Sequence, residues 1–369
     1  MKVLAVFGTR PEAIKMCPVV LELYRHPDVQ TRVCVTGQHR AMLDQVLDIF
    51  TVTPDYDMAI MRPRQTITDI TTAVLTGMGP VLDDFAPDVV LVHGDTTTSM
   101  AAAMAAFYQQ VPVGHVEAGL RTYNIYSPFP EEMNRKLITA LATHYFAPTP
   151  GNQAALAREG ITDNVVVTGN TVIDSFQYTL RPDYVFKDSL LAAHDFSEKT
   201  ILLTAHRREN LGRPLENICH AVRALVEDHP DVSVVYPVHL NPAVRETVFD
   251  ILGGLPRVSL IDPIDVEDMH NAMERCYLVM TDSGGLQEEA PHLGKPVIVL
   301  RTETERPEAV DAGTAVVAGI ETQVIIDIVD NLLQSPDAYT SMSQAMNPYG
   351  DGHASERIVE YLRTRITGV

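Results

Sequence analysis

The sequence is poor in the features that mark disulfide-linked, metal-binding or membrane-spanning proteins. Only four cysteines occur in 369 residues, none forms a C-x-x-C pair, and none stands beside a histidine at metal-ligand spacing. No H-E-x-x-H segment is present, and no apolar run approaches the roughly 18 residues that cross a bilayer. The apolar stretch before Gly8 is too short for a signal-peptide core. We therefore predict a cytoplasmic protein with reduced thiols and no metal site.

Positive charge is also scarce, with 28 Lys and Arg against 48 Asp and Glu and a formal net charge of −20. A field of this sign repels phosphate backbones and anionic lipid, which argues against nucleic-acid and membrane partners. A small anionic ligand would need basic side chains gathered at its binding site. With 46% apolar and 21% charged residues the chain is globular, and its length favours two domains.

Short β-branched runs alternate with longer helical patterns along the chain, which is typical of parallel α/β sheets. The strands predicted in the first half are Lys2–Phe7, Arg32–Thr36, Asp88–His93, Val111–Val116 and a less regular one around Tyr145. Predicted helices among them are Ala13–Tyr24, Ala41–Phe50 and Thr97–Gln109. After a pause at Leu180–Ser197 the predicted strands are Thr200–Thr204, Ser233–Pro237, Val258–Ile261, Leu278–Thr281, Pro296–Leu300 and Thr314–Val317.

This pattern predicts two doubly wound α/β domains. We assign residues 1–169 to the first and 170–352 to the second, and expect a last helix, about 353–369, to pack back on the first. Ligands of open parallel sheets bind beyond the carboxyl ends of the strands. The residues directly after each predicted strand are therefore the candidates for chemistry.

The first strand is followed by Gly8-Thr9-Arg10-Pro11-Glu12-Ala13-Ile14-Lys15. Gly8 permits a tight turn, Pro11 suits the first helical position, and the free backbone N–H groups of a helix start attract anions. Arg10 and Lys15 add positive charge, so the segment suits a diphosphate. The alternative is an ordinary βα turn with two solvated basic side chains.

Three carboxylates follow in consecutive loops of the same half. Asp95 and Glu117 each stand just after a predicted strand, and Glu131 opens a helix after two prolines. Asp95 could instead cap the following helix, and Glu131 with Glu132 could serve the helix dipole. Carboxylates gathered in one site would shift one another's pKa values and could divide acid and base roles.

The second half offers basic and hydroxyl groups at its strand ends. His206 lies between a strand and Arg207-Arg208, where it suits an anion or a proton transfer, or is a lone surface histidine. Ser283, Gly284 and Gly285 allow a backbone close to phosphate, and Glu289 could bind both hydroxyls of a ribose. Arg306 stands at another turn, whereas His239 is compatible with a satisfied core histidine.

Together the segments GTRPEAIK, HGDTTT, HVEAGLRT, PFPEEMNR, TAHRREN and DSGGLQEEAP resemble the non-hydrolysing UDP-N-acetylglucosamine 2-epimerases, in order from residue 2 to about residue 315. The resemblance implies two Rossmann-like domains facing a cleft (GT-B type), a homodimer, and reversible conversion of UDP-GlcNAc into UDP-ManNAc for polysaccharide synthesis. It implies elimination of UDP to a 2-acetamidoglucal and re-addition. No cofactor is expected, since the dinucleotide fingerprint G-x-G-x-x-G that an oxidative route would need is absent.

By the same resemblance, Asp95, Glu117, Glu131 and His206 are the catalytic residues. The implied substrate-binding residues are Arg10, Lys15, Asp95, Glu117, His206, Ile264, Met269, Ser283, Gly284, Gly285, Glu289 and Arg306. Met269 stands where many relatives place an aromatic residue against uracil, and methionine can pack on a base. Some bacterial members of the family also bind a second UDP-GlcNAc as an allosteric activator. The matching positions here are Gln38, Arg64, Glu131, Arg207 and His239, although Ala41 replaces a longer polar residue.

Three other activities remain open from the sequence. A hydrolysing relative would release free sugar and UDP, although such relatives depart from the Gly8–Lys15 motif. A GT-B glycosyltransferase would share the fold, but three clustered carboxylates exceed what transfer usually requires. A nucleotide-sugar sensor would bind without turnover.

Overall fold

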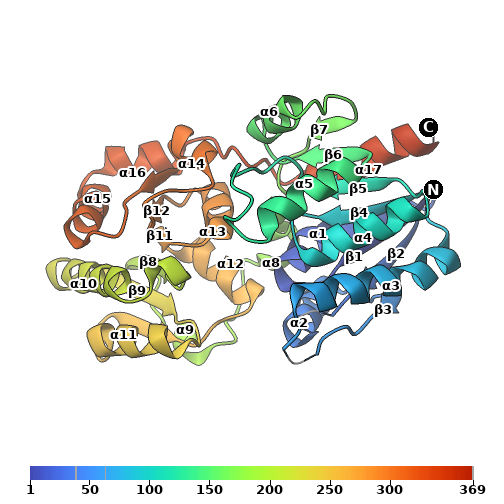
Figure 1. Ribbon diagram of the computed structural model, residues 1–369. Coiled ribbons are helices and arrows are strands. Elements are labelled where there is room, and N and C mark those ends of the chain that lie inside the picture. Colours follow the sequence, from blue (N-terminus) through green and yellow to red (C-terminus); the bar gives the residue numbers. More distant parts are fainter. Residues whose placement is uncertain (38–39, 63, 368–369) are drawn as a thin grey trace. The chain divides into compact units, whose positions relative to one another are not determined.

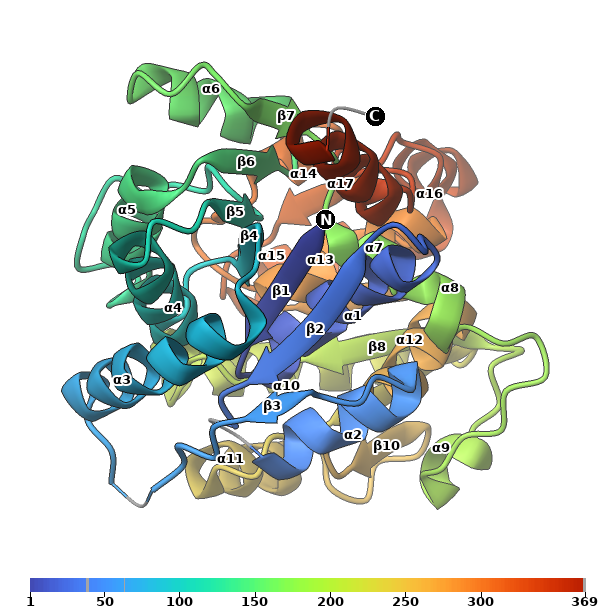
Figure 2. The same cartoon turned by 90° about the vertical axis from the view of Figure 1, so that its right-hand side faces the viewer.

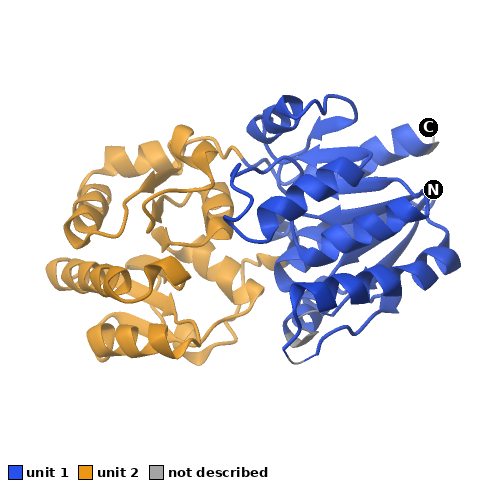
Figure 3. Cartoon of the chain, in the orientation of Figure 1, with its two compact units in different colours: residues 1–178, 349–369 blue, residues 179–348 orange. Residues whose placement is uncertain are grey.

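The chain forms two compact units, each built on a parallel sheet (Figures 1 and 3). The computed structural model describes residues 1–37, 40–62 and 64–367. Unit 1 comprises residues 1–178 and 349–369, and unit 2 comprises residues 179–348. The chain therefore enters unit 2 once and returns to unit 1 for its last segment.

The sheet of unit 1 has seven strands in the order β3-β2-β1-β4-β5-β6-β7, all parallel. Their bounds are β1 Lys2–Phe7, β2 Gln30–Val35, β3 Tyr56–Asp57, β4 Val89–His93, β5 Val113–Val116, β6 His144–Ala147 and β7 Val165–Val167. The chain adds strands on one side of β1 and then, from β4 on, on the other. The switch point between β1 and β4 is where a parallel sheet leaves room for a ligand.

Helices cover both faces of this sheet because the strand side chains alternate between them. Val3, Ala5 and Phe7 pack in one core with helices α1, α2 and α17, whereas Leu4 and Val6 pack in another with α3, α4 and α5. In Figure 2, α3, α4 and α5 lie on one side of β1 and β2, and α1, α7 and α17 on the other. Unit 1 is therefore doubly wound.

The helices of unit 1 are α1 Arg10–Tyr24, α2 Arg40–Phe50, α3 Ile67–Phe85, α4 Thr97–Tyr108, α5 Glu131–Leu141, α6 Pro150–Arg158, α7 Thr171–Asp174, α8 Phe176–Thr179, which ends one residue into unit 2, α17 Ala354–Leu362 and the π-helical turn η3 Arg363–Thr367. The last helix belongs to unit 1 through Ile358, Val359 and Leu362, which share the core of α1. Asp174 accepts hydrogen bonds from the backbone N–H groups of Ala354 and Ser355, and so holds the start of α17.

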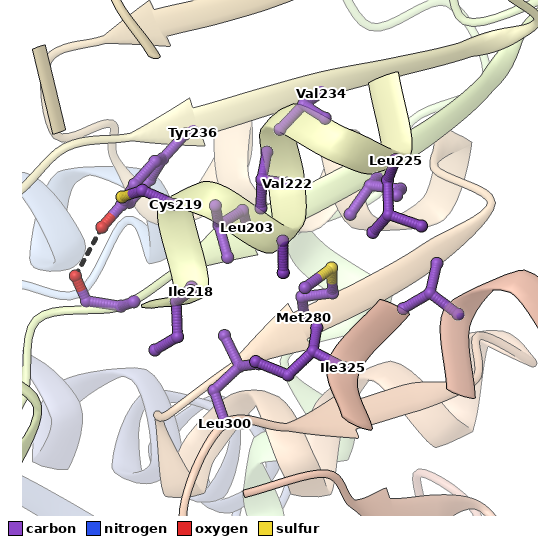
Figure 4. Close-up of a cluster of buried hydrophobic side chains, with 14 of the residues drawn as sticks. Leu203, Ile218, Cys219, Val222, Leu225, Val234, Tyr236, Met280, Leu300 and Ile325 are labelled. Atoms are coloured by element: carbon purple, nitrogen blue, oxygen red, sulfur yellow. Dashed lines mark hydrogen bonds between the residues drawn. The ribbon is translucent and has the colours of Figure 1, made fainter. Parts of the chain in front are cut away.

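Unit 2 has a six-stranded parallel sheet in the order β10-β9-β8-β11-β12-β13. Its strands are β8 Lys199–Thr204, β9 Val232–Pro237, β10 Val258–Ile261, β11 Leu278–Thr281, β12 Val297–Val299 and β13 Ala315–Val317. The core of one face packs Leu203 and Met280 against α10, α11 and α15 (Figure 4). The hydroxyl of buried Tyr236 donates to the carbonyl oxygen of Ala205 at 2.6 Å, which satisfies the polar end of that ring.

The helices of unit 2 are α9 Ser189–Ala192, η1 Arg208–Asn210, α10 Arg213–Asp228, α11 Pro242–Leu252, α12 Val266–Arg275, α13 Gly284–Glu289, η2 Ala290–Leu293, α14 Pro307–Asp311, α15 Thr322–Gln334 and α16 Pro336–Ser343. Leu202 and Val279 point away from the core of α10, and α12 contacts β8 on that side. Both faces of the second sheet are therefore covered as well.

The predicted fold class, two parallel α/β sheets with helices, is confirmed. Every predicted strand occurs, with ends that differ by at most two residues. The prediction omitted β3 and β7, which have two and three residues and lie at the two edges of the sheet. All four cysteines are free and buried. Among the described residues, no helix combines the length and the hydrophobicity that a membrane span requires.

Candidate active site

The Gly8–Lys15 segment turns tightly out of β1 at the switch point of unit 1. A Cβ on Gly8 would stand 2.0 Å from Thr36 Oγ1 and 2.9 Å from Thr98 Oγ1, so only glycine fits. Thr9 caps α1, and its hydroxyl accepts a hydrogen bond from the backbone N–H of Glu12. Arg10 begins α1 and is half-buried, and it forms no ion pair with a described residue. The turn therefore presents a cation and a helix start together.

Glu12 links this turn to the loop that carries Asp95. It is 2% exposed, and its carboxylate accepts from the N–H groups of Gly8 and Thr9 at 3.1 and 2.8 Å. It also accepts from the hydroxyls of Thr96 and Ser99 at 2.6 and 2.9 Å. We did not predict this residue from the sequence, although Thr9-x-x-Glu12 is a capping box that could have revealed its local part.

Glu117 directly follows β5, and its side chain is more enclosed than that of Asp95, at 11% against 23% exposed. It adopts a left-handed backbone at φ +65°, which is uncommon outside glycine. Its carboxylate forms an ion pair with Lys15 of α1 and lies 3.5 Å from His93 Nε2. Burial acts to raise the pKa of Glu117, but Lys15 and His93 outweigh it and hold that pKa well below the usual value. Glu117 is therefore an anion at neutral pH.

Asp95 lies after β4 and pairs with Arg135 of α5, whose Nη2 is 2.6 Å from Asp95 Oδ2. The capping alternative for Asp95 is wrong, because Thr96 is the residue that caps α4. Arg135 also binds Glu132 at 3.0 Å, and Glu132 accepts from the backbone N–H groups of Thr122 and Tyr123. Glu132 is therefore a buried loop anchor, and Arg135 is a site residue that the sequence analysis missed.

Glu131 is the first residue of α5 and lies one position before that anchor. Its Oε2 is buried and forms no hydrogen bond with a described residue. Unit 1 thus brings Asp95, Glu117 and Glu131 together on neighbouring loops at the carboxyl end of its sheet.

The buried His115 on β5 hydrogen-bonds the carbonyl oxygen of Gly94 at 2.7 Å, and burial lowers the pKa of His115 to about 4. His115 is therefore neutral and donates that hydrogen bond.

In unit 2, buried Asp282 shapes the turn that carries His206. Asp282 Oδ2 accepts from the backbone N–H groups of His206 and Arg207, each at 2.8 Å, and from Asn210 Nδ2 at 3.0 Å. The His206 side chain is 43% exposed and its ring lies parallel to that of His239, with centroids 5.1 Å apart. The interpretation of His239 as a core histidine is wrong, since it is exposed at the end of β9.

Two guanidinium groups lie beside the Ser283-Gly284-Gly285 turn. A Cβ on Gly284 would stand 3.6 Å from Arg306 Nη2 and 3.8 Å from Arg207 Nη2. Arg306 is also ion-paired with Glu288 through its Nε and donates to the carbonyl oxygen of Glu305 through its Nη1, whereas its Nη2 lies toward the turn. Unit 2 therefore places two guanidinium groups at the carboxyl end of β11, which suits charge-assisted hydrogen bonds to an anion.

Glu289 folds back over the same turn. Its Oε1 would lie 3.2 Å from a Cβ on Gly285, and its Oε2 lies 3.4 Å from Nε2 of the buried His270. Ile264 precedes α12 and Met269 lies within it, and both are half-buried. These positions lie in the same unit as the basic turn.

The residues predicted to bind a second ligand are divided between the two units. Gln38 lies outside the described residues, and Arg64 is exposed in unit 1, where Glu131 also lies. Arg207 and His239 belong to unit 2. Ala41 is in α2. Within the described ranges, no group of three or more His, Cys, Asp or Glu side chains could hold a metal ion.

Fold and site together define a two-unit α/β protein that has ion-paired carboxylates at the carboxyl end of one parallel sheet and a glycine turn beside two arginines at the carboxyl end of the other. Residues 21–363 match the family described as UDP-N-acetylglucosamine 2-epimerase, and the chain belongs to that family. It is 54% identical to the UDP-N-acetylglucosamine 2-epimerase of Bacillus subtilis (98% of this chain, 95% of that protein). It is 53% identical to that of Escherichia coli K12 (98% of each chain).

A solved structure supports the same assignment. The crystal structure of UDP-GlcNAc 2-epimerase from Neisseria meningitidis bound to UDP-GlcNAc is similar with a TM-score of 0.91 and 50% identity, over 99% of this chain and all of that one. The family resemblance predicted from the six motifs is therefore confirmed.

Proposed function

We propose that the protein interconverts UDP-GlcNAc and UDP-ManNAc without hydrolysis, by eliminating UDP to a 2-acetamidoglucal and adding it back. The observation that carries this proposal is the set Asp95, Glu117 and Glu131 on neighbouring loops of unit 1, with Glu117 held ionised by Lys15 and His93. Membership of the family and the named relatives support the same substrate.

The chemistry of the sugar explains why several carboxylates are useful. The C2 proton has no adjacent carbonyl to acidify it, so inversion needs either oxidation or a good leaving group at C1. UDP is such a group, and no cofactor is then required. Removing the proton from one face and returning it on the other calls for two proton-handling groups. Asp95, Glu117 and Glu131 supply them, with His206 as a fourth catalytic group.

We place the nucleotide on the basic turn of unit 2. Charge develops on the diphosphate as the C1–O bond breaks, and prearranged donors stabilise it. Arg306 and the Ser283–Gly285 backbone are suitably arranged to stabilise this charge. We propose the same role for His206, Arg10 and Lys15. Glu289 would bind the ribose, and Ile264 with Met269 would pack on uracil.

We further propose a cytoplasmic homodimer that binds a second UDP-GlcNAc as an activator, at Gln38, Arg64, Glu131, Arg207 and His239. The stacking of His239 on His206 supports a link between the two ligand sites, since a ligand that moves one ring must disturb the other. Activation requires that UDP-ManNAc alone turn over slowly and that trace UDP-GlcNAc accelerate it. Full turnover of UDP-ManNAc alone would contradict activation.

The decisive experiment is incubation with UDP-GlcNAc in D2O, followed by NMR. We expect UDP-ManNAc and UDP-GlcNAc that both carry deuterium at C2, because the proton on C2 exchanges with solvent during elimination. Free N-acetylmannosamine with UDP would indicate hydrolysis instead. No turnover would leave transfer or sensing, and UDP-ManNAc without deuterium would refute the proposed proton exchange.

A further inference from the structure

The two oxygens of the Glu117 carboxylate have different surroundings. Oε2 receives the Lys15 ammonium and Asn170 Nδ2, the latter at 3.1 Å, and lies 3.5 Å from His93 Nε2. Oε1 forms no hydrogen bond with a described residue, and it would lie 3.5 Å from a Cβ on Gly94, where glycine has none. One oxygen is therefore held by the protein, and the other faces the open backbone of the β4 turn.

The amide of Asn170 is fixed in the orientation that this contact needs. Asn170 is 2% exposed and caps α7, because its Oδ1 accepts from the backbone N–H of Val172 at 3.1 Å. The N–H of Val172 can only donate and the Glu117 carboxylate can only accept. The NH2 group of Asn170 must therefore face Glu117.

The backbone of Asn170 is held by the segment through which the chain returns to unit 1. Its N–H donates to the carbonyl oxygen of Tyr349 at 2.7 Å, and Tyr349 is the first residue after the return. Gly169 and Gly350 touch through their backbones, since a Cβ on Gly350 would stand 3.0 Å from Gly169 Cα. Asn170 thus joins Glu117 to the point where the chain comes back from unit 2.

We propose that Asn170 is a positioning residue for Glu117: it holds Oε2 against Lys15 so that Oε1 is the oxygen presented to the substrate. This inference rests on the proposed function, because it assigns Asn170 a part in the proton transfer at C2. The rival explanation is that Asn170 serves only as the cap of α7. The two explanations can be tested separately, because Nδ2 of the amide donates to Glu117 whereas Oδ1 caps α7.

The variant Asn170→Asp keeps the cap and removes the donor. Aspartate caps helices as well as asparagine does, so Val172 keeps its acceptor. A second carboxylate then faces Glu117, which also meets Lys15 from α1 and His93 from the end of β4. We expect kcat to fall about 100-fold, because that is the scale of a lost hydrogen bond to a charged group. KM should change less than about threefold. The acid limb of the kcat profile should move about one pH unit higher, because two adjacent carboxylates retain a proton more strongly.

The variant Asn170→Ser separates the lost donor from the added charge. Serine also caps a helix, but its short hydroxyl does not replace the amide donor. We expect a similar fall in kcat with an acid limb close to that of the wild type. The control is Ser335→Asp, which adds a carboxylate at the capped start of α16 in unit 2 and should leave kcat, KM and the pH profile unchanged.

Thermal unfolding of all three variants tests the rival explanation directly. Wild-type kcat for Asn170→Ser, or an unshifted acid limb for Asn170→Asp, would overturn the positioning role. A kcat loss no larger than the loss of folded protein would overturn it as well, because a cap alone predicts that result. Absence of epimerisation by the wild type would instead refute the proposed function.

Discussion

The two units place their charged groups differently. In unit 1 Glu117 and Asp95 are ion-paired, and the Glu117 and Lys15 side chains are both 11% exposed, whereas the buried Oε2 of Glu131 has no hydrogen-bond partner among the described residues. In unit 2 exposure around the basic turn is uneven, since the Arg306 side chain is 11% exposed but those of His206 and Arg207 are 43% and 32% exposed. An enclosed ion pair fixes the protonation of a carboxylate, whereas a partly exposed arginine beside a glycine turn can bind an anion. On the proposed function, this comparison predicts that unit 1 carries most of the proton transfer and unit 2 most of the nucleotide binding.

The strongest test of this division is Asp95→Asn. The amide is nearly isosteric and can still accept from Arg135, but it is a much weaker base than the carboxylate. If Asp95 transfers the C2 proton, deuterium exchange at C2 in D2O should fall about 1000-fold, within the range for a lost acid–base group. The affinity for UDP, measured by calorimetry, should stay the same because unit 2 is untouched.

The matched control for that variant is Asp28→Asn, which alters another carboxylate paired with an arginine in unit 1. Asp28 Oδ2 lies 3.0 Å from Arg363 Nε at an exposed site. Exchange should be unaffected there. Unchanged exchange in Asp95→Asn itself would remove Asp95 from proton transfer.

Acid should destabilise unit 1 through His115. Burial lowers the pKa of His115 from 6.5 to about 4. Between these two pH values the unfolded chain binds a proton at His115 and the folded chain does not. The resulting stability is fully present above pH 6.5 and is lost as the pH falls toward 4. Its full size is about 3 kcal/mol, from about 1.4 kcal/mol per pH unit. The depressed pKa of Glu117 adds a separate loss only below its ordinary value of 4.5.

Unfolding of the wild type and of His115→Gln between pH 7.5 and 4.5 measures this effect. Glutamine can still donate to Gly94 but cannot take up a proton, so its melting temperature should fall less steeply in acid. The control His220→Gln replaces an exposed imidazole on α10 and should follow the wild type. Parallel curves for His115→Gln and the wild type would show that His115 does not resist protonation.

The sequence predicted the strands and the strand-end residues because both depend on local pattern. It could not predict the partners of those residues, since the pairing of Lys15 with Glu117 and of Asp95 with Arg135 is made only when the sheet forms. Glu12 is an example: its capping box is local, but its hydrogen bonds to Thr96 and Ser99 come from the start of α4, far along the chain.

The sequence also could not show which of two neighbouring residues caps α4. Thr96 and Asp95 are both good caps, and the backbone after β4 selects Thr96, which frees Asp95 for Arg135. Asn170 and Asp282 were not predicted as site residues for a similar reason. Each acts on a neighbour far along the chain or through backbone N–H groups that carry no sequence signal.

The smallest expected effect belongs to Arg306→Lys in unit 2, and it sharpens the comparison because it should weaken the diphosphate contact without touching the carboxylates of unit 1. Lysine keeps the charge but loses the planar fork that reaches both Glu288 and the Gly284 turn. We expect kcat/KM for UDP-GlcNAc to fall about tenfold, since one donor to the diphosphate is weakened both in the bound substrate and as the C1–O bond breaks. Steady-state kinetics with Arg245→Lys, an exposed pair with Asp262, as the control would measure this. An unchanged kcat/KM would mean that Arg306 does not contact the diphosphate, and the placement of the nucleotide on unit 2 would then lose this support.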